Sequence, residues 1–181
     1  MIHKTIFAGF GGQGVLMMGY SYANAAMHHN YHVTYLPSYG AEVRGGTANC
    51  TVAVADEEIA SPIASEPDFL VAMNTPSLFT FQNRIAPTGA FFLNSSIIEA
   101  RPSRTDIRVY AVPAGEIAAG LGNPRVQNIV MMGAYVRKTG LVPTETFLKS
   151  LKEIIGEKKK SLMELNRNAF AAGYDFAGGI D

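Results

Sequence analysis

The chain has 181 residues, 48% of them hydrophobic, and its 15 Lys and Arg residues balance its 15 Asp and Glu residues. This length suits one α/β domain that buries its apolar surface without disulfide bonds. The balanced charge gives no reason to expect nucleic acid or an anionic membrane as a partner. The single cysteine, Cys50, excludes an internal disulfide and cannot alone hold a structural zinc or an iron–sulfur cluster.

The first residues lack the pattern of a secretory signal, and the apolar stretches are short. Met1–Lys4 lead into a strand-like run without a basic head, an apolar middle and a small-residue cleavage site. Gln13, Asn24 and the histidines interrupt the longest apolar stretch before the roughly 18 residues that a membrane span needs. We therefore expect a cytoplasmic protein with no membrane partner.

Strand-like and helical patterns alternate along the chain. Taken in order, they predict a strand over 4–10, a helix over 15–29, strands over 32–37, 48–55 and 69–74, a helix over 76–85, strands over 89–96 and 108–113, a short helix after Pro113, and helices over 124–140 and 144–160. We interpret Lys158–Lys160 as the solvated end of the last helix.

This alternation predicts an α/β fold, in which one domain over residues 1–181 forms a three-layer α/β/α sandwich with a mainly parallel sheet. The strand over 48–55 follows the strand over 32–37 closely. Such a short connection favours antiparallel pairing, so we expect a mixed sheet.

The stretch GFGGQGV, residues 9–15, joins the first predicted strand to the first helix. Gly9, Gly11 and Gly14 have the spacing G-x-G-x-x-G, a tight turn at a helix N-terminus whose N–H groups can receive an anion. Close packing of the strand on the helix is the alternative reading. The region around the end of the second strand, Tyr35–Tyr39, lacks the acidic residue of an NAD or FAD site. A Walker P-loop is excluded because no lysine followed by Ser or Thr closes the turn.

Arg44 is the first lysine or arginine after Lys4, and Gly45 and Gly46 follow it. Two glycines let a backbone or a ligand approach closely, so this guanidinium could clamp a phosphate or a carboxylate. Pairing with Glu42, or with a carboxylate of a partner chain, is the alternative. Both readings stay open on the sequence alone.

The histidines and the cysteine fit structural roles better than catalytic ones. His28, His29 and His32 lie near a predicted helix end, where the helix dipole favours them, and no carboxylate or cysteine is close in sequence. Cys50 lies in an apolar strand, which is typical of a small core residue. We therefore assign no metal site and no catalytic residue to this chain.

Six segments carry a more specific signal than the glycine turn: GFGGQGV, SYGAEVRGGTANCTV, SPIASEPDFLVAMN, GAFFLNSSII, NIVMMGAYVRKTG and NRNAFAAGY. Together they resemble the gamma chain of the 2-oxoacid:ferredoxin oxidoreductases, in order and spacing, over nearly the whole chain. Ala41 and Val43 depart from the Pro and Met that the family commonly has beside the glutamate of the second segment.

The resemblance implies a multisubunit enzyme that converts a 2-oxoacid such as pyruvate or 2-oxoglutarate, coenzyme A and oxidised ferredoxin into acyl-CoA, carbon dioxide and reduced ferredoxin. It further implies that alpha and beta chains hold thiamine diphosphate and magnesium, and that a cysteine-rich delta chain or domain holds the iron–sulfur clusters. This chain would then bind no cofactor alone, and coenzyme A would be its co-substrate. The single cysteine agrees with that division of labour.

The same resemblance places the gamma chain on the coenzyme A side of the active region. We carry this role over to the two matching glycine loops, whose residues are Gly11, Gly12, Gln13, Gly14, Arg44, Gly45 and Gly46. A helix N-terminus and an arginine offer hydrogen-bond donors to a diphosphate. Asn74, Asn94 and Ser95 are second candidates, because they follow strands at the edge where such sheets open into crevices.

Two predicted helices contain stretches without charge, over residues 15–27 and 126–136. A free monomer rarely exposes so large an apolar surface. We therefore expect residues 15–27 or 126–136 to form part of a subunit interface. Two other functions stay open, a stand-alone nucleotide-binding protein and a purely structural assembly chain, and copurification with a thiamine-binding partner would separate them.

Overall fold

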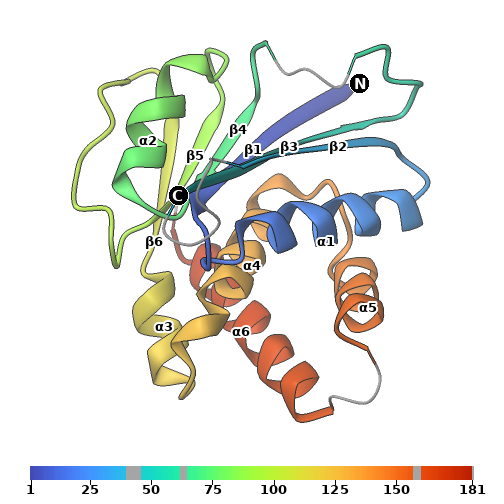
Figure 1. Ribbon diagram of the computed structural model, residues 1–181, viewed down its shortest axis with the longest axis vertical. Coiled ribbons are helices and arrows are strands. Elements are labelled where there is room, and N and C mark those ends of the chain that lie inside the picture. Colours follow the sequence, from blue (N-terminus) through green and yellow to red (C-terminus); the bar gives the residue numbers. More distant parts are fainter. Residues whose placement is uncertain (40–45, 62–64, 157–159, 181) are drawn as a thin grey trace.

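A six-stranded mixed sheet forms the centre of the computed structural model, which describes residues 1–39, 46–61, 65–156 and 160–180 (Figure 1). The strands lie in the order β2-β3-β1-β4-β5-β6. Their bounds are Ile2–Phe10 (β1), His32–Tyr39 (β2), Thr47–Ala55 (β3), Phe69–Ala72 (β4), Ala90–Asn94 (β5) and Arg108–Val112 (β6). Each predicted strand is present, with small shifts at its ends.

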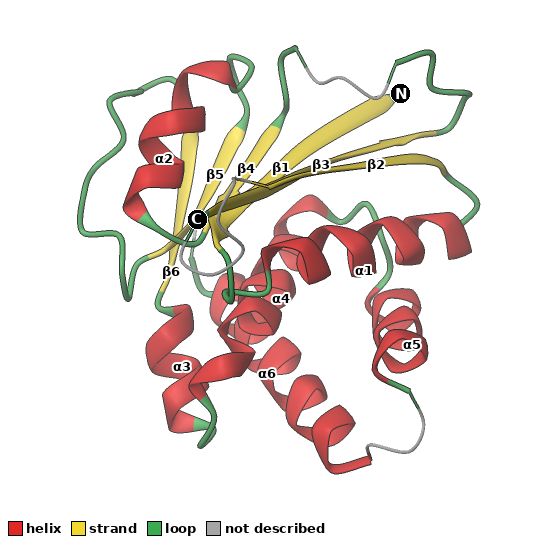
Figure 2. Cartoon of the chain, viewed as in Figure 1, coloured by secondary structure: helices red, strands yellow, loops and turns green. Residues whose placement is uncertain are grey.

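Helices cover the two faces of this sheet unequally (Figures 1 and 2). One face carries α1 (Val15–His28), α3 (Ala114–Gly120), α4 (Gln127–Thr139), α5 (Thr144–Ile155) and α6 (Lys160–Gly178). The other face carries α2 (Thr75–Phe81), which continues into the 3-10 turn Gln82–Arg84, and a second 3-10 turn, Pro124–Val126, precedes α4. The predicted three-layer α/β/α fold is therefore confirmed. Among the described residues, no helix has both the length and the apolar character that crossing a membrane requires.

β1 organises the sheet because strands of both directions pair with it. It runs antiparallel to β3, with Ile6 opposite Thr51, and parallel to β4, with Ile6 opposite Leu70. β2 pairs antiparallel with β3, whereas β5 and β6 extend the parallel side. The predicted antiparallel pairing is confirmed, and the parallel strands β1, β4, β5 and β6 all end at one edge.

A glycine lets α1 lie directly against β3. A Cβ atom on Gly19 would collide with the sulfur of Cys50, which lies 3.7 Å from the carbonyl oxygen of Val15. Burial raises the pKa of the Cys50 thiol to about 12, so the thiol is protonated at neutral pH. The prediction that Cys50 is a small core residue is confirmed.

The uncharged stretch 126–136 lies inside the chain. Every residue from Val126 to Val136 except Gln127 is buried. The ring of Tyr135 meets Phe7 edge-on, and its hydroxyl lies 2.6 Å from Thr5 Oγ1. A charged side chain would lose its hydration here, which explains the absence of charge. The expectation of a subunit interface at 126–136 is therefore wrong, and only residues 15–27 remain candidates.

The C-terminal helix α6 is absent from the predicted elements. The helix predicted over 144–160 ends at Ile155, where Gly156 has a φ of +86° and leaves the helix. Lys160 begins α6 instead of ending the preceding helix, and Lys158 and Lys159 lie outside the described residues. The interpretation of the lysine run as a helix end is therefore wrong for Lys160.

Two glycines allow α6 to cross α4 at backbone contact. A Cβ atom on Gly133 would collide with the carbonyl oxygen of Phe170, and one on Gly173 with that of Val130. Where side chains are absent on both helices, the backbones pack directly against each other. This crossing is what buries the outer side of α4.

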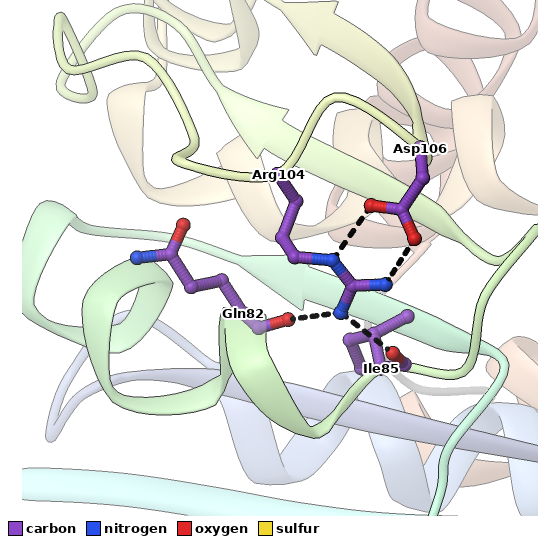
Figure 3. A network of polar contacts seen from close by, with 4 residues as sticks. All are labelled: Gln82, Ile85, Arg104 and Asp106. Atoms are coloured by element: carbon purple, nitrogen blue, oxygen red, sulfur yellow. Dashed lines mark hydrogen bonds and ion pairs between the residues drawn. The ribbon is translucent and has the colours of Figure 1, made fainter.

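The side chain of Arg104 links the segment before β6 to the 3-10 turn after α2, at the edge of the sheet where β5 and β6 begin (Figure 3). The guanidinium of Arg104 donates to both carboxylate oxygens of Asp106, over 2.7 and 2.5 Å, and to the carbonyl oxygens of Ile85 and Gln82, over 2.9 and 3.4 Å. Arg104 thereby lowers the pKa of the Asp106 carboxyl and satisfies carbonyls at the end of the 3-10 turn. This edge is opposite to the one where the parallel strands end.

The crossing of α4 and α6 predicts a specific loss of stability. Gly173→Ala should lower the free energy of unfolding by about 2 kcal/mol or more, because the new methyl group has no space beside Val130. Gly120→Ala is the matched control, since nothing lies within 4 Å of the added Cβ in α3, and it should leave the stability unchanged or raise it by up to about 1 kcal/mol. Urea denaturation measures both, and equal stabilities would contradict the backbone contact.

Candidate functional site

The glycine turn lies at the edge where the parallel strands end. It connects Phe10, the last residue of β1, to Val15, the first residue of α1. Gly12 has a φ of +101° and Gly14 a φ of +72°, a region that residues with side chains rarely adopt. Gly14 is the N-cap of α1 and provides no side-chain cap. The first N–H groups of the helix are therefore available to an anion.

Gln13 has the only side chain within the turn, and this side chain points into the protein. Its Oε1 accepts hydrogen bonds from the backbone N–H of Phe10, at 2.7 Å, and from Nδ2 of Asn74, at 3.1 Å. Its Nε2 donates to the carbonyl oxygen of Met73 at 3.1 Å. Gln13 thus joins the ends of β1 and β4 and leaves the outer side of the turn lined by backbone.

Gly46, the described residue of the second glycine loop, is hydrogen-bonded to the first loop. The N–H of Gly11 donates to the carbonyl oxygen of Gly46 at 2.9 Å, so the structure brings these two predicted site residues together. Arg44 and Gly45 lie outside the described residues. The expectation that the guanidinium of Arg44 clamps a phosphate therefore stays a prediction.

Asn74 lies on the inner side of the turn, where both the oxygen and the nitrogen of its amide make hydrogen bonds. Its Oδ1 accepts from the backbone N–H of Ser77 at 2.9 Å and caps α2, and its Nδ2 donates to Gln13. The residue is only 1% exposed. Asn74 therefore supports the turn from its inner side, and a contact of Asn74 with coenzyme A stays a prediction.

Two amides at the start of α4 also belong to this edge, and the sequence analysis missed them. Gln127 Oε1 accepts from Nδ2 of Asn94 at 3.0 Å, while Asn128 Nδ2 lies 3.5 Å from the carbonyl oxygen of Gly14. A Cβ atom on Gly14 would lie 2.9 Å from Cγ of Asn128. The signal available in the sequence was this pair of adjacent amides directly before an apolar run, because buried amides need hydrogen-bond partners.

The remaining strand-end candidates are farther from the turn. Asn94 is buried and reaches it only through the start of α4. Ser95 donates its N–H to the carbonyl oxygen of Val112 at 2.9 Å, between β5 and β6. Among the described residues, the predicted site residues that lie together at the turn are Gly11, Gly12, Gln13, Gly14, Gly46 and Asn74. Ser95 lies elsewhere, at the ends of β5 and β6.

A shallow hollow of about 250 Å³ opens beside the turn and the first residues of α1. Its lining consists of Phe10, Gly11, Gly12, Gly14, Val15, Leu16, Met17 and Ala48. None of these lining residues carries a charged or titratable side chain. The described lining residues therefore offer backbone donors and apolar walls, and their side chains carry no group that acts as a general acid, a general base or a nucleophile.

The histidines of the described chain do not gather around this edge. His28 lies at the far end of α1, where its Nε2 is 2.8 Å from Oε2 of Glu153 on α5. Within the residues that the structure describes, no three His, Cys, Asp or Glu side chains come together as metal ligands would. The structural interpretation of His28 agrees with this helix-to-helix contact.

Comparisons with known proteins agree with the resemblance. The profile of the family described as "Pyruvate ferredoxin/flavodoxin oxidoreductase" matches residues 4–176. Ketoisovalerate oxidoreductase subunit VorA of Methanothermobacter thermautotrophicus is 40% identical over 96% of this chain, which spans 36% of that relative. The 2-oxoglutarate synthase subunit KorC of Methanocaldococcus jannaschii is 32% identical over 94% of this chain and 91% of its own length. The chain thus spans about a third of the VorA relative and nearly all of KorC.

Solved structures show the same fold. The gamma subunit of a keto/oxoacid ferredoxin oxidoreductase from Geobacter sulfurreducens PCA superposes with a TM-score of 0.83 and 26% identity, over 97% of this chain and 98% of that one. A 2-oxoglutarate:ferredoxin oxidoreductase from Magnetococcus marinus reaches a TM-score of 0.92 at 22% identity, over 99% of this chain and 32% of that one. The chain belongs to the pyruvate ferredoxin/flavodoxin oxidoreductase family, as a gamma subunit of the 2-oxoacid:ferredoxin oxidoreductases.

Proposed function

We propose that this chain works inside a complex that oxidatively decarboxylates a 2-oxoacid to acyl-CoA and reduces ferredoxin, and that it contributes the coenzyme A side of the site. The observation that carries the proposal is the glycine turn at the N-terminus of α1. Gly12 is exposed there, and the adjoining hollow is lined by backbone and apolar side chains. A diphosphate of coenzyme A would accept hydrogen bonds from this backbone.

The electrostatics of the turn suit an anion better than a cation. The helix dipole places partial positive charge at the N-terminus of α1, and the first turn of this helix contains no acidic residue. The carboxylate that an NAD site needs for its ribose is likewise missing from the end of β2. A phosphate ester carrier such as coenzyme A therefore fits better than a nicotinamide dinucleotide.

The proposal leaves the bond-breaking chemistry to other chains. The one cysteine is buried beneath α1, and the residues that the structure describes around the hollow carry no titratable side chain. We expect alpha and beta chains to hold thiamine diphosphate and magnesium, and a delta chain or domain to hold the clusters that pass electrons to ferredoxin. In VorA this region makes up about a third of a longer chain, so the gamma-type domain also occurs joined to further sequence.

The Magnetococcus protein gives the proposal a further argument. Its structure was solved with 2-oxoglutarate, coenzyme A and succinyl-CoA bound, and its fold covers 99% of this chain. A chain with the same fold and an uncapped helix N-terminus at its glycine turn can serve the same co-substrate. A stand-alone nucleotide-binding protein and a purely structural assembly chain are the alternatives that the experiments below exclude or support.

The outer face of α1 supports a role in assembly. Tyr20 is 49% exposed and Met27 is 62% exposed, and the half-buried Leu16 and Met17 continue the same apolar side toward the hollow. This helix carries no Lys, Arg, Asp or Glu. We propose that this face docks on a catalytic chain, which would place the hollow at the boundary between subunits.

A charged side chain introduced at position 12 tests whether the glycine turn binds the diphosphate of coenzyme A. A side chain there would enter open space, because nothing lies within 4 Å of the added Cβ. Gly12→Asp and Gly12→Asn impose the same backbone strain and differ in charge. In the assembled complex, assayed with pyruvate, 2-oxoglutarate or 2-ketoisovalerate, Gly12→Asp should raise the KM for coenzyme A roughly tenfold more than Gly12→Asn. Equal KM values would exclude an anion from this turn.

Arg44 provides an independent test from the second loop. Arg44→Ala should raise the KM for coenzyme A in the assembled complex by roughly tenfold, because a charge-assisted hydrogen bond to phosphate is lost. Arg44→Lys keeps the charge and should recover part of the effect. An unchanged KM in Arg44→Ala would remove this residue from the site.

Assembly can be tested through Tyr20. Tyr20→Glu places a carboxylate on the uncharged face of α1 and should weaken copurification of the thiamine-binding chain by roughly tenfold or more. Tyr20→Phe keeps the ring contact with Tyr35 and should copurify normally. The isolated chains should melt alike, because this side chain is half exposed. Full recovery of the complex with Tyr20→Glu would contradict docking on α1.

A further inference from the structure

Gln13 is the only residue between Gly11 and Gly14 that has a side chain, yet it does not line the hollow. We infer that Gln13 is a positioning residue, which holds the backbone of the glycine turn in the conformation that receives the diphosphate without touching the ligand itself. This inference rests on the proposed coenzyme A role of the turn. It assigns a different task to a residue that the sequence analysis placed in contact with coenzyme A.

The hydrogen bonds of Gln13 fix the direction of its amide. Its oxygen faces two donors, the N–H of Phe10 and the amide of Asn74, and its nitrogen faces one acceptor, the carbonyl of Met73. A reversed amide would oppose donor to donor and acceptor to acceptor at every one of these contacts. The side chain therefore has one satisfied orientation, and the turn is held in one place.

The partner of Gln13 is itself fixed. Asn74 must present its oxygen to the N–H of Ser77 to cap α2, so its nitrogen is directed at Gln13. The turn is thereby tied to the end of β1, to the end of β4 and to the first residues of α2. Rigid strands and a capped helix are a firmer support than the turn could provide alone, because glycines restrict the backbone least.

The absence of a side chain at Gly9 leaves space for the amide of Gln13. A Cβ atom at Gly9 would lie 2.7 Å from Oε1 of Gln13 and 2.7 Å from Cγ2 of Val15. Any side chain at this position would push the amide out of its place or move the start of α1. Gly9 is thus required by Gln13 and Val15 together, whereas Gly12 and Gly14 are explained by their positive φ angles.

Accurate placement matters because backbone donors recognise an anion through their geometry. A displacement of about 1 Å in a group that positions a reactant can cost a large part of its contribution. Loss of the three hydrogen bonds of Gln13 would free the turn to move, without removing a single ligand contact. The affinity for coenzyme A would then fall while the chemistry on the other chains continued.

Gln13→Met tests this, because methionine has a similar length and makes no strong hydrogen bonds. In the assembled complex we expect the KM for coenzyme A to rise roughly tenfold, with kcat at saturating coenzyme A and the KM for the 2-oxoacid unchanged. Gln82→Ala is the matched control. Gln82 is also buried and accepts from the backbone N–H of Ser103 at 2.9 Å, and it lies at the opposite edge of the sheet. It should lower the melting temperature and leave both KM values as they are.

If the Gln13→Met variant does not assemble into the complex, Asn74→Ser tests the positioning role of Gln13 instead. A serine hydroxyl can still cap α2, but it lacks the amide that donates to Gln13. The same selective rise in the KM for coenzyme A is expected. An unchanged KM for coenzyme A in the variant that assembles would reduce Gln13 to a structural residue and overturn the inference.

The Gly12→Asp and Gly12→Asn pair, measured alongside, separates the two possible failures. If that pair differs in the KM for coenzyme A while Gln13→Met leaves it unchanged, only the positioning role is lost. If that pair gives equal values, the proposed coenzyme A contact of the turn fails, and the inference about Gln13 fails with it.

Discussion

One amide side chain makes the sharp connection from β1 to α1 possible. The backbone must turn within the four residues Gly11–Gly14, and two of these adopt positive φ angles that provide no stabilisation of their own. Gln13 compensates by joining Phe10 to the end of β4 from the inner side. Because the only side chain of the turn is used there, the outer side is left to backbone. The glycine motif, the uncapped helix and the hollow all depend on this arrangement.

The same edge is supported throughout by neutral amides. Gln13 and Asn74 hold the turn from the side of β4, whereas Asn128 lies against Gly14 from the start of α4. Amides hold the backbone by hydrogen bonds without adding charge, so they leave the partial positive charge of the α1 N-terminus undiminished. An acidic residue in these positions would oppose an anion. The described side chains of this edge are thus compatible with the proposed binding of an anion.

Much of the fold could be predicted from the sequence, because hydrophobic periodicity reports local structure. The alternation of strands and helices gave the α/β sandwich, and the short link after β2 indicated antiparallel pairing, as observed. Burial by a distant element was not predictable in the same way. The uncharged stretch of α4 resembled an exposed interface because α6, which covers it through Gly133 and Gly173, was not among the predicted helices. Small residues at a helix crossing carry little periodic signal.

The candidate site shows a similar limit. The spacing of Gly9, Gly11 and Gly14 indicated the turn and its place before α1, and a Cβ atom at Gly9 or Gly14 would indeed collide with neighbouring atoms. The direction of Gln13 could not be inferred, since it depends on Met73 and Asn74, which lie about sixty residues away in sequence. Spacing along a chain identifies a turn, and only tertiary structure shows which side of it remains open.

Amide hydrogen exchange in the assembled complex tests the central claim most directly, because the claim concerns backbone N–H groups at the start of α1. Exchange is measured by mass spectrometry on peptides covering the glycine turn, with and without coenzyme A. The account predicts that coenzyme A slows exchange in the peptide over residues 11–18 and leaves the α4–α6 crossing unaffected. Protection that appears only in the partner chains, with no change in residues 11–18, would contradict it.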